Sequence, residues 1–171
     1  MQNIEFKAEL RNIEAARTQC AALPAVHIGI LTQTDLYFKL SDGRLKRRSA
    51  PGEPVEWIFY HRPDRASPRM SNYSILSDEQ AKRRWGTESL KPWLTVVKLR
   101  DLWMFGEVRI HLDEIEGLGC FLEFEAKVSR RFNVKACHDA IAELRTVFAP
   151  VLGEPVSASY SDLMAMEAGV S

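Results

Sequence analysis

The sequence predicts an α+β fold, in which antiparallel strands form a sheet and a few amphipathic helices cover its apolar side. Two observations lead to this prediction. Apolar and charged residues alternate with a period of two through residues 3–10, 107–113 and 120–128, and successive side chains of a strand point to opposite sides. Other segments have helical spacing and follow capping residues. Each strand therefore has one apolar face for the helices and one ionic face that points away from them.

The first half of the chain predicts one helix among several strands. Strands are expected over residues 2–10, 26–31, 35–40, 44–49 and 55–61, and a helix over residues 11–23. The helix ends before Pro24, since the residue before a proline disfavours helical geometry. Ser-Asp-Gly at 41–43 predicts the tight turn of a hairpin. Residues 64–72 are polar and contain prolines, so a loop is expected there.

The second half predicts further strands and three helices. Strands are expected over residues 73–76, 94–100, 103–113 and 120–128, with a tight turn near Asp101. Ser77 with Gln80 matches a capping box, which predicts a helix to about residue 85 or 90. Asn133 can cap another helix, which ends at about residue 149, before a proline. A last short helix is expected over residues 161–167.

Length and composition predict a single domain over residues 1–171, with 46% hydrophobic and 27% charged residues. Lys plus Arg and Asp plus Glu balance at 23 each, so no overall charge attracts nucleic acid or a membrane, and neither is expected as a partner. No segment resembles a signal peptide or reaches membrane-spanning length, which makes a cytoplasmic location the expectation. Cys20, Cys120 and Cys137 form no CxxC pair and are expected to be free thiols.

The ionic strand faces allow two interpretations. An antiparallel sheet with one solvated face shows the same alternation. Alternatively, the sheet curls into a barrel and the ionic faces enclose a lumen. The cations Arg44, Lys46 and Arg48 share one strand face, where their mutual repulsion favours an anionic partner. A lumen of cations and carboxylates would suit a polyphosphate and its metal ion.

Five segments, in order along the chain, carry a resemblance to a known family. They are Asn3-Ile-Glu5-Phe-Lys7; Gln33-Thr-Asp-Leu-Tyr-Phe38 with the basic strand at 44–48; Lys98-Leu-Arg100; residues 108–123; and Ser159-Tyr-Ser-Asp-Leu163. With them the chain resembles the CYTH-domain proteins of the triphosphate tunnel metalloenzymes, close to the class IV adenylyl cyclase branch. Asn3 stands where the family's ExExK motif has its first glutamate. This change removes a negative charge and is expected to weaken metal binding or leave one catalytic metal.

The resemblance implies an eight-stranded antiparallel β-barrel, a tunnel with helices packed on its outside. It also implies a site for a linear triphosphate and for Mg²⁺ or Mn²⁺. The expected substrate-binding residues are Lys7, Lys46, Arg48, Arg62, Lys98, Arg100 and Arg109, although His61 could take the place of Arg62. The expected metal ligands are Glu5, Asp113, Glu123 and Glu125. The expected catalytic residues are Lys7, Arg100 and Asp113, and Asp113 would bind the metal or act as an orienting base.

Three functions stay open at this point. A class IV adenylyl cyclase, which converts ATP to cyclic AMP and pyrophosphate, is favoured by the overall match. A triphosphatase would instead direct water at tripolyphosphate, thiamine triphosphate or a nucleoside triphosphate, and a binding module would hold such a ligand without turnover. The residue types suit all three, because phosphoryl chemistry depends mostly on positioning and charge neutralisation. A homodimer is a possibility by analogy with the family.

Overall fold

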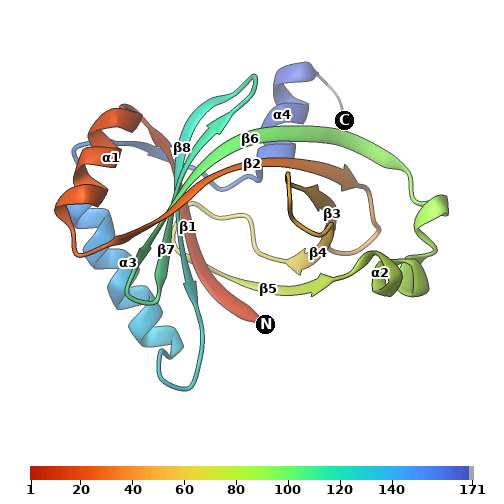
Figure 1. Ribbon diagram of the computed structural model, residues 1–171, viewed down its shortest axis with the longest axis horizontal. Coiled ribbons are helices and arrows are strands. Elements are labelled where there is room, and N and C mark those ends of the chain that lie inside the picture. Colours follow the sequence, from red (N-terminus) through yellow and green to blue (C-terminus); the bar gives the residue numbers. More distant parts are fainter. Residues whose placement is uncertain (170–171) are drawn as a thin grey trace.

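The computed structural model describes residues 1–169, and within them eight antiparallel strands close into a barrel (Figure 1). Neighbouring strands follow the order β5-β4-β3-β2-β6-β7-β8-β1, and the pairing of β1 with β5 closes the ring. The strands are β1 (Gln2–Leu10), β2 (Val26–Phe38), β3 (Arg44–Ser49), β4 (Glu56–His61), β5 (Arg69–Leu76), β6 (Pro92–Phe105), β7 (Val108–Ile115) and β8 (Gly119–Lys127). The predicted α+β class and the eight-stranded antiparallel barrel are confirmed.

Helices pack on the outside of the barrel. They are α1 (Ile13–Ala22), α2 (Asp78–Trp85), α3 (Val134–Phe148) and α4 (Tyr160–Ala168), with a short 3₁₀ turn, η1 (Thr87–Ser89), after α2. The capping box of Ser77 and Gln80 is present, and Gly86, with φ of 56°, ends α2 in the left-handed conformation. Within residues 1–169, no helix combines the length and the apolar character needed to cross a membrane.

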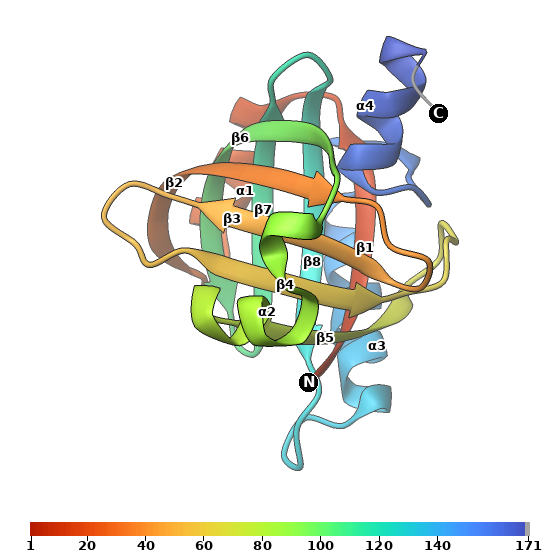
Figure 2. The same ribbon diagram turned by 90° about the vertical axis from the view of Figure 1, so that its right-hand side faces the viewer.

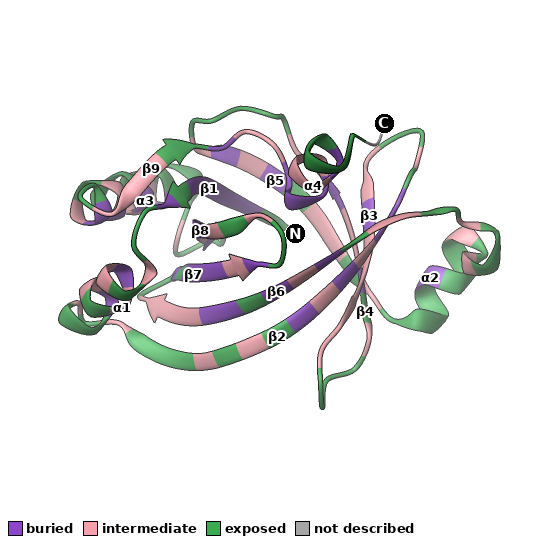
Figure 3. Ribbon diagram, turned by 90° about the horizontal axis from the view of Figure 1, so that it is seen from above, coloured by how far each residue is buried: buried purple, intermediate pink, exposed green. Residues whose placement is uncertain are grey.

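The main hydrophobic core lies between one side of the barrel and two helices. Figure 1 shows α1 and α3 together beside β1, β7 and β8, and Figure 3 shows buried residues along these strands. The alternating apolar residues of the strands, such as Phe6, Ile110 and Phe124, face α3, whose Ile141 and Phe148 are fully buried. Because the helices cover the apolar faces of these strands, those faces form the outside of the barrel. The charged residues between the apolar ones must therefore face the lumen.

The longest strands differ from the prediction. β2 is one strand, where the sequence suggested two, and β6 continues through Asp101, where a turn was expected. The carboxylate of Asp101 is buried on the outer face but lies 3.0 Å from Nε of Arg17 and 2.7 Å from Nε2 of His27. These two partners make a charged residue acceptable inside a strand. The chain turns instead at Gly106, whose φ is 55°.

Two smaller elements were also misplaced. Residues 69–72, expected in a loop, form the first half of β5 and pair with β1. A short strand, β9 (Leu152–Pro155), was not expected and pairs with the last part of β1. Both segments are polar or contain glycine and proline, so their own residues give no strand signal. Their conformation follows from the edge of β1 that β8 leaves open, since β5 pairs with its first half and β9 with its last part.

One end of the lumen is occupied by a second apolar cluster. Tyr37, Val96 and Phe121 lie on the inward faces of β2, β6 and β8, and they pack with Val156 and with Tyr160 at the start of α4. Figure 2 shows α4 beside the barrel, at the upper right. The polar part of the lumen therefore lies between this cluster and the opposite end of the barrel.

Candidate active site

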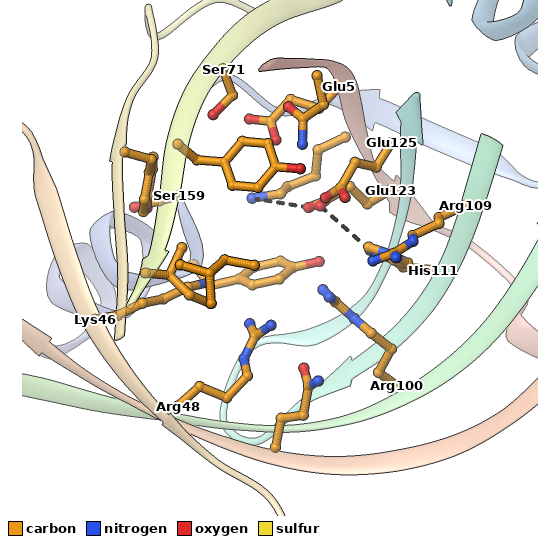
Figure 4. Close-up of a pocket in the computed structure, with 18 of the residues that line it drawn as sticks. Glu5, Lys46, Arg48, Ser71, Arg100, Arg109, His111, Glu123, Glu125 and Ser159 are labelled. Atoms are coloured by element: carbon orange, nitrogen blue, oxygen red, sulfur yellow. Dashed lines mark ion pairs between the residues drawn. The ribbon is translucent and has the colours of Figure 1, made fainter. Parts of the chain in front are cut away.

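A cavity of about 550 Å³ lies inside the barrel, and all eight strands contribute to its wall. Figure 4 shows Lys46, Arg48 and Arg100 on one side of it and Glu5, Glu123 and Glu125 on the other, with Arg109 beside the carboxylates. Ten expected site residues line it: Lys7, Lys46, Arg48, Arg62, Lys98, Arg100, Arg109, Glu5, Glu123 and Glu125. Asp113 does not line it, and neither does Arg44, whose guanidinium is held by Asp64 and Asp162. The structure therefore brings most of the predicted site into one cavity.

A cluster of cations surrounds Asp35 on β2. Arg48 donates two hydrogen bonds of 2.8 Å to its carboxylate, and the Nζ atoms of Lys98 and Lys46 lie 3.0 and 3.2 Å from it. Burial opposes the charge of Asp35, yet the three cations hold its pKa well below the ordinary value. Burial also lowers the pKa of Lys98, assisted by Arg48 and Arg100 and opposed by Asp35. An anion bound in front of this cluster would therefore favour the charged form of Lys98.

Arg100 is held from behind by Asp113. Its Nε and Nη2 atoms each donate a 2.8 Å hydrogen bond to the carboxylate, and the hydroxyl of Tyr160 donates a third of 2.8 Å. Asp113 is fully buried, and although burial alone would raise its pKa, Arg100 lowers it to about 2. Both carboxylate oxygens are thus already engaged. This placement favours a role for Asp113 in orienting Arg100, rather than as a metal ligand.

Lys7 lies at the junction between the cations and the carboxylates. Its Nζ atom is 3.8 Å from Oε2 of Glu123 and 4.0 Å from the ring centre of Tyr160, and it donates a 3.4 Å hydrogen bond to the carbonyl of Ala158. Burial lowers the pKa of Lys7 to about 8, although Glu123 opposes the shift. None of these contacts is a close ion pair. The ammonium group is consequently available to a phosphate oxygen.

Arg62 occupies the position that the sequence left open between it and His61. Its Nη1 donates a 2.8 Å hydrogen bond to Oε1 of Glu5, whereas His61 is exposed and contacts Asp42 at the surface. The Nε and Nη2 atoms of Arg62 are buried and have no hydrogen-bond partner among residues 1–169. Such unsatisfied donors next to a cavity are expected to bind an anion.

Several residues in the cavity wall or next to it had no predicted role. Arg69 is 1% exposed, and its Nε lies 3.6 Å from Oε1 of Glu5. Gln33, Tyr60 and Tyr160 line the cavity. Arg69 was missed because it lies in the segment expected to be a loop. Its period-two spacing with the inward residues at 71 and 73 was the one signal that could have found it.

The carboxylates at the other side of the cavity could hold a cation. One ligand atom each from His111, Glu123 and Glu125 lie within 4.8 Å of one another. Burial opposes ionisation of Glu123, but His111, Lys7 and Arg100 hold its pKa well below the ordinary value, so it is a carboxylate at neutral pH. The amide oxygen of Asn3, also in the wall, is buried and lacks a partner within the described part of the chain. This oxygen-rich set fits a hard divalent cation.

The fold and site together define an antiparallel barrel whose lumen is lined by cationic side chains beside a cluster of carboxylates. The chain belongs to the CYTH domain family, whose model matches residues 1–149. No curated protein sequence matches the chain.

Solved structures share the fold at low sequence identity. The PH1012 protein from Pyrococcus horikoshii is 23% identical, with a TM-score of 0.76 over 94% of this chain and 98% of that one. A candidate adenylate cyclase from Vibrio parahaemolyticus is 17% identical, with a TM-score of 0.75 over 95% and 97%. A candidate adenylyl cyclase from Hippeastrum, described as having a dominant triphosphatase activity, is 17% identical, with a TM-score of 0.62 over 99% and 97%. These likenesses agree with the family assignment.

Proposed function

We propose that this chain is a divalent-metal-dependent enzyme that acts on a nucleoside triphosphate, with conversion of ATP to cyclic AMP and pyrophosphate as its reaction. The observation that carries the proposal is the division of the cavity wall. Cations gather next to the apolar cluster under α4, and carboxylates gather beside them. The other wall residues include Met1, Ile75 and Met104, which offer apolar surface to a nucleoside.

The side chains have the following proposed roles. Lys46, Arg48 and Lys98 bind the oxygens of the terminal phosphates, and Arg100 and Lys7 bind nearer the reacting phosphorus. The ribose 3′-hydroxyl loses its proton to water as its oxygen attacks the α-phosphorus, and the bond from phosphorus to the bridging oxygen breaks, so negative charge grows on the departing pyrophosphate. Fixed cations stabilise that charge without reorganising. A divalent cation held by Glu123 and Glu125, with Glu5 as a further ligand, supplies additional positive charge.

A triphosphatase is the second candidate, favoured by the activity described for the Hippeastrum protein. It would use the same phosphate-binding residues, with water as the nucleophile. The two reactions separate when the purified protein is incubated with Mn²⁺ and either ATP or tripolyphosphate. Cyclic AMP with pyrophosphate supports the cyclase, and release of inorganic phosphate supports the triphosphatase. Tight binding without either product would overturn both and leave a binding module.

Substitutions at Lys7 and Glu123 are expected to affect different ligands. Lys7→Ala removes a charge-assisted hydrogen bond to phosphate and is expected to weaken triphosphate binding roughly 10–100-fold. Glu123→Gln removes a charged metal ligand, so it should mainly raise the Mn²⁺ concentration needed for half-maximal turnover. Isothermal titration with tripolyphosphate and metal-dependent kinetics measure the two effects.

The matched control is Lys135→Ala. Lys135 lies exposed on α3 and pairs with Asp139. Removing this lysine changes the net charge by the same amount but should leave binding and turnover unaltered. Equal effects of Lys7→Ala and Lys135→Ala would contradict the assignment of Lys7 to the site.

A further inference from the structure

One buried histidine in the cavity wall lies near a carboxylate without a hydrogen bond to it. His111 on β7 faces the lumen and is only 3% exposed. Strand register places it between Leu102 of β6 and Glu123 of β8. Its Nδ1 atom makes no hydrogen bond to any other part of residues 1–169. A buried polar atom left unpaired costs about 1–3 kcal/mol, so a ligand that is not part of the chain is expected to bind it.

This nitrogen faces the carboxylate of Glu123. Nδ1 lies 3.5 Å from Oε1 of Glu123, while Oε2 of the same group faces Lys7 at 3.8 Å. Figure 4 shows His111 and Glu123 facing each other, with Glu125 beside them. One ligand atom from each of the three residues lies within 4.8 Å of the others. Donors bound to one ion at about 2.0–2.2 Å are separated by about 3–4 Å, so a small adjustment brings this set around a cation.

We propose that His111 is a nitrogen ligand of the divalent cation in this lumen, together with Glu123 and Glu125. We further infer that it makes the site bind Mn²⁺ and other first-row transition metals more tightly than Mg²⁺. Imidazole nitrogen suits transition metals, whereas Mg²⁺ favours oxygen ligands and water. This inference rests on the proposed metal dependence and adds a ligand and a selectivity to it.

The alternative on the same geometry is an imidazolium paired with Glu123 and no role in metal binding. The wild-type protein distinguishes the two with Mn²⁺ alone as the probe. Pulsed electron paramagnetic resonance of the bound Mn²⁺ is expected to show hyperfine coupling to a ¹⁴N nucleus. Bound Mn²⁺ without nitrogen coupling, or no Mn²⁺ binding at all, would overturn the proposal.

The substitution His111→Gln tests the selectivity. It replaces the nitrogen donor with an amide oxygen. Mn²⁺ affinity should therefore fall roughly 10–100-fold, because the nitrogen ligand is lost. Mg²⁺ affinity, measured by competition, should change less than about threefold, because an oxygen donor remains. The ¹⁴N coupling should disappear. His138→Gln on the outer side of α3 is the matched control and should preserve both affinities, and thermal unfolding of each variant establishes that it is folded. Unchanged Mn²⁺ affinity in His111→Gln would contradict the proposal.

These measurements use no triphosphate, so they fail independently of the proposed reaction. If Mn²⁺ shows nitrogen coupling but the protein turns over neither ATP nor tripolyphosphate, His111 remains a metal ligand and the proposed enzymatic activity is wrong. If the protein turns over substrate with Mn²⁺ bound by oxygen atoms alone, the enzymatic activity stands and the assignment of His111 as a metal ligand is wrong.

Discussion

Replacing Arg100 with alanine is expected to lower kcat/KM for the triphosphate by about 10²–10³-fold, the loss typical of removing one fixed donor to a developing negative charge. The same change should destabilise the fold. Arg100 neutralises the fully buried Asp113 through two 2.8 Å hydrogen bonds. Removing one member of such a pair leaves an unpaired buried charge and costs about 3–5 kcal/mol. Steady-state kinetics and urea unfolding measure the two losses.

A double substitution separates catalysis from folding. Arg100→Met with Asp113→Asn removes both charges and keeps similar volumes, so much of the lost free energy of unfolding should return. Tyr160 can still donate its hydrogen bond to the amide oxygen of the new asparagine. Turnover should stay as low as in Arg100→Ala, because the phosphate contact is still absent. A double variant with near-normal kcat/KM would show that Arg100 serves the fold alone.

The second large effect is expected at Asp35. Asp35→Asn removes the carboxylate that Lys46, Arg48 and Lys98 share, and it leaves these buried cations facing one another. The free energy of unfolding of the empty protein should fall by about 3–5 kcal/mol. Tripolyphosphate restores negative charge at the same place. Its stabilising effect, measured as the rise in Tm at saturation, should therefore be larger in the variant than in the wild type.

The contribution of Asp35 to the free energy of unfolding is expected to decrease in acid. The neighbouring cations hold the pKa of Asp35 well below its ordinary value of 3.8, despite burial. The stabilisation from Asp35 is thus fully present above about pH 4, the unfolded pKa, and is lost as the pH falls through the lowered folded value. The stability curves of wild type and Asp35→Asn should converge in acid.

The control for Asp35→Asn is Asp139→Asn, at an exposed ion pair on α3. This substitution should change the free energy of unfolding by less than about 0.5 kcal/mol at any pH. A gap between wild type and Asp35→Asn that persists undiminished in acid would contradict the assigned charge interactions.

Strand alternation is a local signal, so the sequence predicted strands with one apolar and one ionic face, and the family resemblance implied that these strands close into a barrel. Side chains two residues apart, such as Glu5 and Lys7, must share a face, and the apolar residues between them must be covered. The family motifs then indicated which charged faces meet. The ten predicted residues in the cavity wall follow from these two facts, although their individual roles stay predictions.

The rest depends on pairings between distant segments. Asp35 and Lys98 are 63 positions apart, and their contact exists only because β2 pairs with β6 in one register. For the same reason the sequence left Asp113 open between a metal ligand and an orienting base, and only the structure shows its carboxylate accepting hydrogen bonds from Arg100 and Tyr160. The surroundings of the His111 nitrogen likewise depend on residues of β6 and β8, which lie far from it in the sequence or on another strand.

The order of nucleotide binding and product release depends on the apolar cluster of Tyr37, Val96, Phe121 and Tyr160. Since it fills the end of the channel next to the cations, a nucleotide is expected to enter phosphate tail first and to place its base near the rim. After bond cleavage the fragment at the rim departs freely, whereas pyrophosphate must cross the space that the nucleoside has just vacated. Pyrophosphate should therefore be the last product released and a competitive inhibitor, and cyclic AMP a weak one.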